Sequence, residues 1–469
     1  MSIKLINKKI LHIMNFFLLI FIFLLIFKYK NSDIYYSGFY KNFIIYLSLF
    51  FVFNIIITFQ NSEEVRKIYN IFLISIIASF YSIEIYLNVT VKPHAAIEDL
   101  QFRKEQADKL NLPFDTRTKY EVYNEIKSKG IKVVPTVPPN DIFHKTKTFF
   151  NEISSPIYPI ANISNVTTVF CNESGKRTIY FSDKYGFRNK NDVWDKSEID
   201  IVILGDSLVH GACVDDEYVI SSQLQSITGK NVLNLGIQGH GPLMQIAAIK
   251  EYAYIKKPKI VLWYYSEAND LSNMIYEMSI DKIKKYKEKN YSQKLMDNQE
   301  LIDNQLYSLI NLVSPTEAGD KGEKIEKINY IGLLKLYKLR DFLNYFVPEN
   351  KALIRYKYAP IKTLEEYFAL VKIAKETTEE WGGKFYFVYH PHLTRYIGTY
   401  SLQYGQRQYN YFLKKLKKMN VKIIDLKKNL FDKVGHPKEL YHFGIPGHPS
   451  ENGYKLTAEY FAEVLLINK

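Results

Sequence analysis

The sequence predicts an α/β protein in which a parallel sheet has helices on both faces and is preceded by membrane-spanning helices. Three observations lead to this fold class. Uncharged apolar runs fill much of the first ninety residues, short apolar segments alternate with helical segments in the C-terminal part, and Gly-rich or polar sequences follow several of those apolar segments. Strands that alternate with helices are typical of parallel sheets.

The composition limits the classes of partner. The chain has 469 residues, and its Lys and Arg residues outnumber Asp and Glu by 62 to 49, which gives a formal charge of +13. The basic residues are scattered, and no nucleic-acid-binding motif accompanies them. We therefore expect no nucleic-acid partner, and we interpret the charge as contact with an anionic membrane surface.

The N-terminal region contains three uncharged apolar runs, Ile10–Phe27, Phe43–Phe59 and Ile68–Ile83. A helix that crosses the hydrocarbon needs about 20 residues, and flanking Tyr, Asn and Lys can supply its interfacial ends. No small-residue cleavage site follows the first run, which disfavours a removable signal peptide. We expect residues 1–91 to form a membrane anchor with about three transmembrane helices, so that the protein is multi-pass and the lipid bilayer is a partner.

Residues 92–180 are more polar and are predicted to form an extramembrane connector. Within them, Thr116–Lys129 is interpreted as a short helix and Ile131–Val134 as a strand. Thr168–Phe181 alternates like a β-hairpin, with Asn172–Gly175 as its turn.

Residues 181–469 are predicted to form the catalytic domain, because strands and helices alternate there. The predicted strands are Ile199–Leu204, Asn231–Leu235, Ile260–Tyr264, Lys384–Tyr389 and Val421–Asp425. The predicted helices are Tyr218–Ile227, Pro242–Ile255, Leu364–Glu379 and Tyr404–Lys418. A charged, helical insertion at about 271–350 interrupts the series without a chemical motif and is interpreted as a lid or excursion.

A candidate nucleophile follows the first of these strands. The strand ends in Gly205-Asp206-Ser207, which places a serine side chain at a carboxyl strand end beside a helix N-terminus. Backbone N–H groups there can stabilise an oxyanion, provided that a nearby base removes the hydroxyl proton.

Three further sequences stand where the other parts of such a site would be needed. The second strand runs into Asn234–Gly241, in which glycines allow the backbone to approach a ligand closely. The third strand is followed by Glu267-Ala268-Asn269-Asp270, which supplies an amide donor. Near the C-terminus, His448 stands just before an amphipathic helix and is a candidate base.

At these residues the chain resembles the SGNH/GDSL hydrolase superfamily over about Asp183–Lys469. The resemblance implies a five-stranded flavodoxin-like (SGNH) sheet with Ser207 as the nucleophile and His448 as its base. It further implies an oxyanion hole formed by the Ser207 backbone N–H, the Gly239 N–H and the Asn269 amide. No metal or cofactor is expected, because no set of His, Cys, Asp and Glu has metal-ligand spacing.

Two departures from the family pattern concern the same site. Glu267 occupies a position that is usually Gly, and Ile445 stands where the family often has an Asp three residues before its His. A backbone carbonyl, Glu439 or another acid could orient the His448 imidazole instead, and a Ser–His dyad is a further alternative. Supporting or pocket candidates are Asp206, Glu267, Asp270 and His390.

The remaining histidines are given lesser roles than His448. His390 and His392 follow the fourth strand and are taken as surface residues more readily than as substrate contacts or metal ligands. His210 and His240 are lesser pocket candidates, and His442 is a rival for the base that lacks the family spacing.

The sequence segments Ser182–Asn189 and Glu267–Leu271 resemble those of a membrane-tethered bacterial branch of the superfamily. Members of that branch are often envelope and surface-polysaccharide proteins. This resemblance implies an extracytoplasmic catalytic domain. The only two cysteines, Cys171 and Cys213, could pair in an oxidising compartment or remain two small buried thiols, and the second interpretation is preferred.

The expected function is ester hydrolysis on an acylated envelope or glycan substrate. An O-acyltransferase to a polysaccharide shares the first half-reaction and differs only in the acceptor. A catalytically weak envelope binding or assembly protein is suggested by the absent Asp and by Glu267. Membrane transport would need more than three spans or an intramembrane polar pathway, and Glu84 alone is thin evidence for it.

Overall fold

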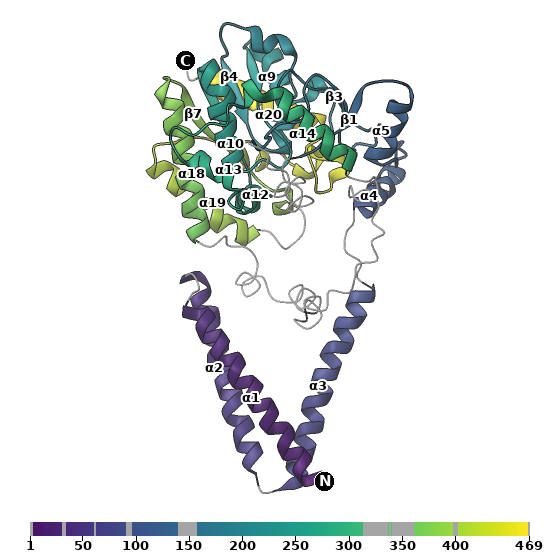
Figure 1. Cartoon of the computed structure of the whole chain (residues 1–469), viewed down its shortest axis with the longest axis vertical. Helices are drawn as coiled ribbons and strands as arrows, with labels where there is room; N and C mark the ends of the chain where they lie inside the picture. Colours follow the sequence, from purple (N-terminus) through teal and green to yellow (C-terminus); the bar gives the residue numbers. More distant parts are fainter. Residues whose placement is uncertain are drawn as a thin grey trace. The chain divides into compact units, whose positions relative to one another are not determined.

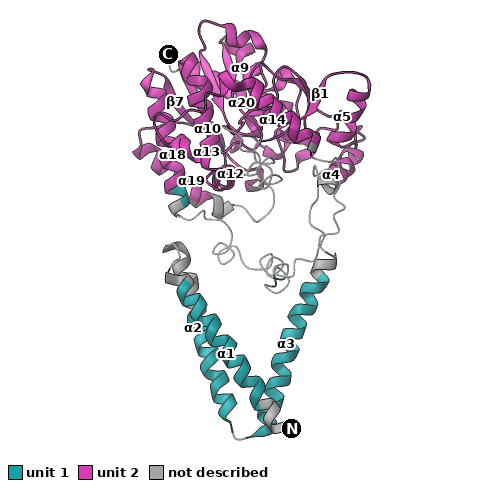
Figure 2. Ribbon diagram, in the orientation of Figure 1, with its two compact units in different colours: residues 1–93, 323–364 teal, residues 94–322, 365–469 magenta. Residues whose placement is uncertain are grey.

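The computed structural model describes residues 3–30, 34–60, 62–90, 96–138, 157–312, 361–396 and 402–467, together with residues 336 and 339. Most of the second half of the predicted insertion, from residue 313 to 350, lies outside these residues. The chain divides into two compact units, one of residues 1–93 and 323–364 and the other of residues 94–322 and 365–469 (Figure 2).

The first unit contains one helix for each apolar run of the sequence (Figure 1). These helices are α1 (Ile3–Lys30), α2 (Ile34–Phe59) and α3 (Glu63–Thr90). Two stretches, Lys8–Phe27 and Glu63–Tyr86, are long and apolar enough to cross a membrane by length and composition, whereas the apolar part of α2, Ile44–Phe59, is shorter. Among the residues that the structure describes, two stretches are thus candidate spans, where the sequence predicted about three.

A buried polar contact joins α1 to α2 inside this unit. Asn54 donates through Nδ2 to Asn15 Oδ1 at 2.7 Å, and Asn15 Nδ2 donates to Thr58 Oγ1 at 3.1 Å. Amide and hydroxyl contacts of this kind link neighbouring helices in apolar surroundings, because each polar group satisfies the other.

The second unit begins with a small sheet and two helices. Their bounds are α4 (Ala96–Lys109), α5 (Lys119–Ser128), β1 (Val133–Pro135), β2 (Thr167–Val169) and β3 (Ile179–Phe181). A capping box of Thr118 and Glu121 starts α5. The strand order is β1-β2-β3, with β1 parallel to β2 and β2 antiparallel to β3. The two halves of the predicted hairpin thus pair with each other, and the strand before them joins the same sheet.

The main sheet has five strands, all parallel to their neighbours, in the order β5-β4-β6-β7-β8. The strands are β4 (Ile201–Leu204), β5 (Val232–Asn234), β6 (Ile260–Ser266), β7 (Lys384–His390) and β8 (Lys422–Asp425). This order is flavodoxin-like, with the first strand between the second and third, and it confirms the predicted parallel sheet.

Helices cover both faces of the main sheet. They are α8 (Ser207–His210), α9 (Ile220–Thr228), α10 (Pro242–Ala248), α11 (Tyr254–Lys256), α18 (Ile361–Glu380), α19 (Leu402–Lys418) and α20 (Glu451–Ile467). After β6 come α12 (Asp270–Glu277), α13 (Asp281–Lys284) and α14 (Gln299–Leu312).

Side-chain alternation along the strands builds two cores. On one face, Ile203 of β4 belongs to a buried cluster with Leu224 of α9 and Phe461 of α20. On the other face, Tyr265 of β6 packs against aromatic rings that include Phe412 of α19. Since every strand is parallel, the carboxyl ends of β4, β5 and β6 lie together at one edge, which is where the candidate site forms.

Candidate active site

Ser207 is the first residue of the short helix α8, which follows β4 directly. The Asp206 carboxylate caps this helix by accepting the Leu208 N–H at 3.0 Å. Gly205 leaves room for the turn, since a Cβ there would lie 2.5 Å from Val209 Cγ2. The strand, the turn and the cap therefore hold the Ser207 hydroxyl at the edge of the sheet.

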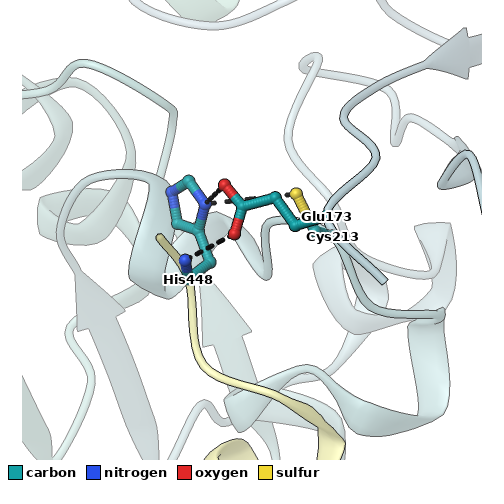
Figure 3. Close-up of side chains that lie close together, drawn as sticks. All are labelled: Glu173, Cys213 and His448. Atoms are coloured by element: carbon teal, nitrogen blue, oxygen red, sulfur yellow. Dashed lines mark hydrogen bonds and ion pairs between the residues drawn. The ribbon is translucent and has the colours of Figure 1, made fainter. Parts of the chain in front are cut away.

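His448 and Glu173 complete a continuous set of contacts that starts at Ser207. His448 Nε2 lies 2.8 Å from Ser207 Oγ, and His448 Nδ1 lies 2.8 Å from Glu173 Oε1. The His448 backbone N–H also donates to Glu173 Oε2 at 2.6 Å, so both carboxylate oxygens face this one residue (Figure 3). The arrangement fits a serine, a base and an orienting acid.

The carboxylate that faces the His448 ring comes from a segment that the sequence did not indicate. Glu173 is separated from His448 by 275 residues and lies in the hairpin turn that the sequence analysis interpreted only as a turn. Glu439, the acid considered there, is exposed in the short 3₁₀ helix Pro437–Leu440. The turn itself is well ordered, because Asn172 accepts the Gly175 N–H at 2.9 Å and donates to the Asp115 carbonyl at 2.7 Å.

Arg103 of α4 contacts both Glu173 and the loop that bears His448. Its Nη2 donates to the Pro446 carbonyl at 2.8 Å and lies 3.6 Å from Glu173 Oε1. Gly447 permits this packing, because a Cβ at that position would come within 2.3 Å of Glu173 Oε2 and 2.6 Å of Arg103 Nη2. The segment before the main sheet therefore contributes two charged residues to the site.

The charges of the site favour an ionised acid and a basic imidazole. Burial alone would raise the pKa of Glu173, but the charge and hydrogen bonds of His448, helped by Arg103, lower it to about 2. Burial pulls the pKa of His448 down, but Glu173 and then Asp206 outweigh it, so the pKa is raised above its ordinary value. Near neutral pH the carboxylate is thus ionised and faces the imidazole.

The two other predicted oxyanion donors follow the strands on either side of β4. Gly239 lies after β5 in a turn with φ +83°, and Asn269 caps α12 after β6. In the part of the chain that the structure describes, the backbone N–H groups of Ser207 and Gly239 donate to no protein acceptor. These two backbone donors are therefore available at neighbouring strand ends, whereas the Asn269 side chain is hydrogen-bonded to the Asp206 carboxylate.

Glu267, which replaces the usual Gly, lies in a buried ion pair. Arg395 contacts both of its carboxylate oxygens, Tyr389 donates its hydroxyl to Oε1 at 2.8 Å, and the His392 N–H donates to Oε2 at 3.0 Å. The Glu267 carboxylate thus connects the loop after β7 to the segment that follows β6. Glu267 itself stands two residues before Asn269. A buried charge is tolerated here because it is paired and hydrogen-bonded.

His390 is buried in the core, which corrects its interpretation as a surface residue. Its Nδ1 lies 2.8 Å from the Tyr264 hydroxyl and its Nε2 lies 3.0 Å from the Tyr441 hydroxyl. Burial lowers its pKa to about 3, so the ring is neutral. Asp270 is also fully buried, and burial followed by the nearby Asp206 charge raises its pKa well above the ordinary value.

Three further histidines, His210, His240 and His442, also lie in the interior. His210 contacts the Tyr180 hydroxyl at 2.9 Å through Nε2, and His240 contacts the Ile160 carbonyl at 2.6 Å through its own Nε2. His442 is buried as well, with its Nδ1 4.0 Å from Glu451. His448 alone of the histidines in the described residues has a hydrogen bond to Ser207.

Cys171 and Cys213 form a disulfide with a Cα–Cα distance of 5.2 Å, contrary to the preferred interpretation of two free thiols. Cys213 Sγ lies 4.0 Å from His448 Nδ1. Ligand-type atoms of Glu173, Cys213 and His448 lie within 4.8 Å of one another (Figure 3). A cation fits this donor set poorly, because the sulfur is bonded to Cys171 and the carboxylate and imidazole already face each other.

Comparisons with known proteins find similarity in solved structures alone. No protein-family model matches the sequence, and no curated protein matches it. A member of the lipolytic protein G-D-S-L family from Veillonella parvula is 16% identical, with a TM-score of 0.30 over 57% of this chain and 98% of that one. A GDSL-like lipase from Bacteroides thetaiotaomicron is 11% identical, with a TM-score of 0.31 over 59% and 91%. A catalytic mutant of an acetylxylan esterase from Geobacillus stearothermophilus is 13% identical, with a TM-score of 0.30 over 56% and 93%.

Proposed function

We propose that the protein is a membrane-anchored serine ester hydrolase that acts on an acylated envelope or glycan substrate. The observation that supports this most strongly is the unbroken Ser207–His448–Glu173 set of contacts, with 2.8 Å at each of its two links. A serine with both a base and an orienting acid is typical of acyl-transfer chemistry.

In the proposed mechanism, Ser207 Oγ attacks the acyl carbonyl while His448 Nε2 accepts its proton. Glu173 holds the proton on Nδ1, which leaves Nε2 as the acceptor, and it stabilises the imidazolium that forms. The Ser207 and Gly239 N–H groups and the Asn269 amide stabilise the tetrahedral oxyanion. His448 then returns the proton to the leaving alcohol, and water attacks the acyl-enzyme by the same route in reverse.

The binding or assembly alternative loses the two observations that suggested it. Glu173 faces His448 where the usual Asp is absent, and Glu267 forms an ion pair with Arg395. An acyltransferase would use the same residues with a sugar hydroxyl in place of water. An experiment that separates the two functions must therefore vary the acyl acceptor.

Fluorophosphonate labelling of the purified full chain tests the function without knowledge of the substrate. We expect the reagent to modify Ser207, and a chromogenic acetyl ester to be hydrolysed. Adding a glycan acceptor should leave turnover unchanged if water is the acceptor. Acylated glycan detected by mass spectrometry would show a transferase, and an unlabelled, intact protein would contradict ester chemistry altogether.

Replacing Asn269 with alanine tests the oxyanion hole. Loss of one such donor typically costs about 10²–10³-fold in kcat, and we expect a loss in this range with little change in KM. The effect should fall on kcat because the amide is needed where charge develops in the transition state. A KM effect alone would assign Asn269 to substrate binding, and thermal melting of the variant serves as the control for folding.

The membrane anchor and the extracytoplasmic location are part of the same proposal. The two candidate spans support an anchor, and the disulfide supports an oxidising compartment. Alkylation of the chain in denatured whole-cell lysate tests the location. We expect Cys171 and Cys213 to react only after reduction, whereas immediate alkylation of both would indicate the cytoplasm.

A further inference from the structure

The disulfide links the two segments that supply opposite ends of the candidate relay. Cys171 stands two residues before Glu173 in the hairpin, and Cys213 stands six residues after Ser207, in the loop that follows α8. The bond therefore connects the acid-bearing turn to the nucleophile-bearing loop across 42 residues of chain. Its sulfur atoms lie beside the site, since Cys213 Sγ is 4.0 Å from His448 Nδ1.

The Cys213 side of this link is held firmly by other contacts. The Arg188 guanidinium donates to the Gly211 carbonyl at 2.6 Å and to the Val214 carbonyl at 2.9 Å, which brackets Cys213. Tyr454 of α20 donates its hydroxyl to the Ala212 carbonyl at 3.3 Å. This loop would keep its place without the disulfide.

The hairpin tip is ordered by contacts to the segment before it, because Asn172 donates to the Asp115 carbonyl at 2.7 Å and the Asp115 N–H donates to the Gly175 carbonyl at 2.9 Å. These contacts do not reach the loop that bears Cys213. The strands of the hairpin are fixed by the buried contact of Tyr180 with His210. The tip reaches the loop beyond Cys213 through a second link, the ion pair of Lys176 with Asp215 at 2.6 Å. That pair is exposed, with side-chain exposures of 73% and 37%, so it contributes little. The covalent bond is therefore the stronger of these two direct links between the tip and the loop.

We propose that the Cys171–Cys213 disulfide is a positioning element that fixes Glu173 against His448, so that opening the bond slows the chemistry of Ser207. This inference rests on the proposed function. A dithiol can open the bond, because Cys171 is only half-buried. A thiolate of the reagent attacks one sulfur of the disulfide, which releases the other cysteine and forms a mixed disulfide with the reagent. The second thiol of the reagent then attacks its own sulfur in this mixed disulfide and releases the remaining cysteine, so that two protein thiols and the oxidised reagent result.

The consequence for pH follows from the charged groups that face His448. They are Glu173 from the hairpin and Asp206 from the α8 cap, which raise its pKa, together with Arg103 from α4, which lowers it; His442, from the 3₁₀ turn before the His448 loop, is also nearby. Movement of Glu173 away from the ring removes the main raising effect, so the pKa of His448 falls. Because the base must be neutral, the acid limb of the rate profile moves to lower pH while the maximal rate decreases.

The test compares the oxidised and the dithiol-reduced full chain. A displacement of about 1 Å can cost on the order of 10²-fold, and we expect reduction to slow Ser207 labelling by about 10- to 100-fold. The double variant Cys171→Ser, Cys213→Ser should label slowly in both conditions. Lys176→Ala is the matched control: it removes the other link between the same segments and should label like the unmodified chain.

A second measurement separates failure of this inference from failure of the proposed function. In the Ser207→Ala chain, ¹³C-histidine NMR, assigned with a His448→Gln derivative, reports the pKa of His448 without any reaction. A fall of this pKa on reduction supports the positioning role even if no ester is ever cleaved. An unchanged pKa, or an oxidised and a reduced chain that label at equal rates and with the same pH profile, would overturn it.

Discussion

Replacing Ser207 with alanine is expected to abolish fluorophosphonate labelling and to lower esterase kcat by roughly 10⁶-fold, as loss of the serine does in a comparable relay. In the proposed mechanism the hydroxyl oxygen forms the covalent bond, and its proton passes to His448 Nε2, which lies 2.8 Å away. Alanine supplies neither the oxygen nor the proton. The fold should be unaffected, because Ser207 Oγ has no structural partner besides His448 among the described residues.

The control for this substitution is a serine that makes an ordinary helix contact. Ser308 of α14 donates to the Asn304 carbonyl at 2.8 Å on the surface, so Ser308→Ala should keep both labelling and activity. Circular dichroism and thermal melting of both variants measure the fold. Full activity in folded Ser207→Ala would place the chemistry on another residue.

The Glu173→Gln substitution should lower kcat by about 10⁴-fold, the effect of the corresponding acid-to-amide change in a serine relay. The amide keeps the size of the side chain but offers its own N–H, and so it favours the tautomer with the proton on Nε2 of His448. Glu439→Gln is the matched control, because this exposed carboxylate was the acid considered from sequence. It should retain the rate of the unmodified chain.

The pH profile gives Glu173→Gln a second signature. Glu173 raises the pKa of His448, and activity in the unmodified chain is lost as the pH falls through that raised pKa. Without the charge the pKa falls, so the acid limb moves to lower pH even though the plateau is much lower. A plateau that drops without any movement of the limb would indicate damage to the fold instead of loss of the acid.

The strands and the motif residues at their ends were predictable because they depend on local pattern. Short buried segments at regular spacing predicted the parallel sheet, and Ser207, Gly239 and Asn269 each lie within five residues of the end of such a strand. His448 precedes an amphipathic helix and was found in the same way. These residues are placed by the strand or helix next to them, so neighbours in sequence suffice to predict them.

Glu173 could not be predicted in this way, because its role depends on a tertiary contact across 275 residues. Asn, Ser and Gly are common in hairpin turns, so this sequence suggests a turn and no further role. Nothing in its periodicity indicates that the Glu173 carboxylate faces a distant imidazole. One weak signal existed: the acid stands two residues from Cys171, and the only other cysteine lies six residues after Ser207. A pairing of the two would have brought the turn to the nucleophile.

His390 was misinterpreted for a related physical reason. Its sequence position after a strand end is typical of a loop, but β7 extends to it and two tyrosine hydroxyls engage its ring. Neither tyrosine is its neighbour in sequence. Burial of a neutral histidine between hydroxyl partners leaves no mark in local pattern.

Whether Glu173 acts together with Ser207 and His448 can be measured through the second-order rate constant for modification of Ser207. Peptide mass spectrometry of the fluorophosphonate-treated full chain gives this constant for the unmodified protein, His448→Ala, Glu173→Gln and Glu439→Gln. We expect modification at Ser207, a loss of at least about 10²-fold in His448→Ala and in Glu173→Gln because members of one relay act as a unit, and no loss in Glu439→Gln. Modification at a different residue, or a Glu173→Gln chain that reacts as fast as the unmodified protein, would contradict it.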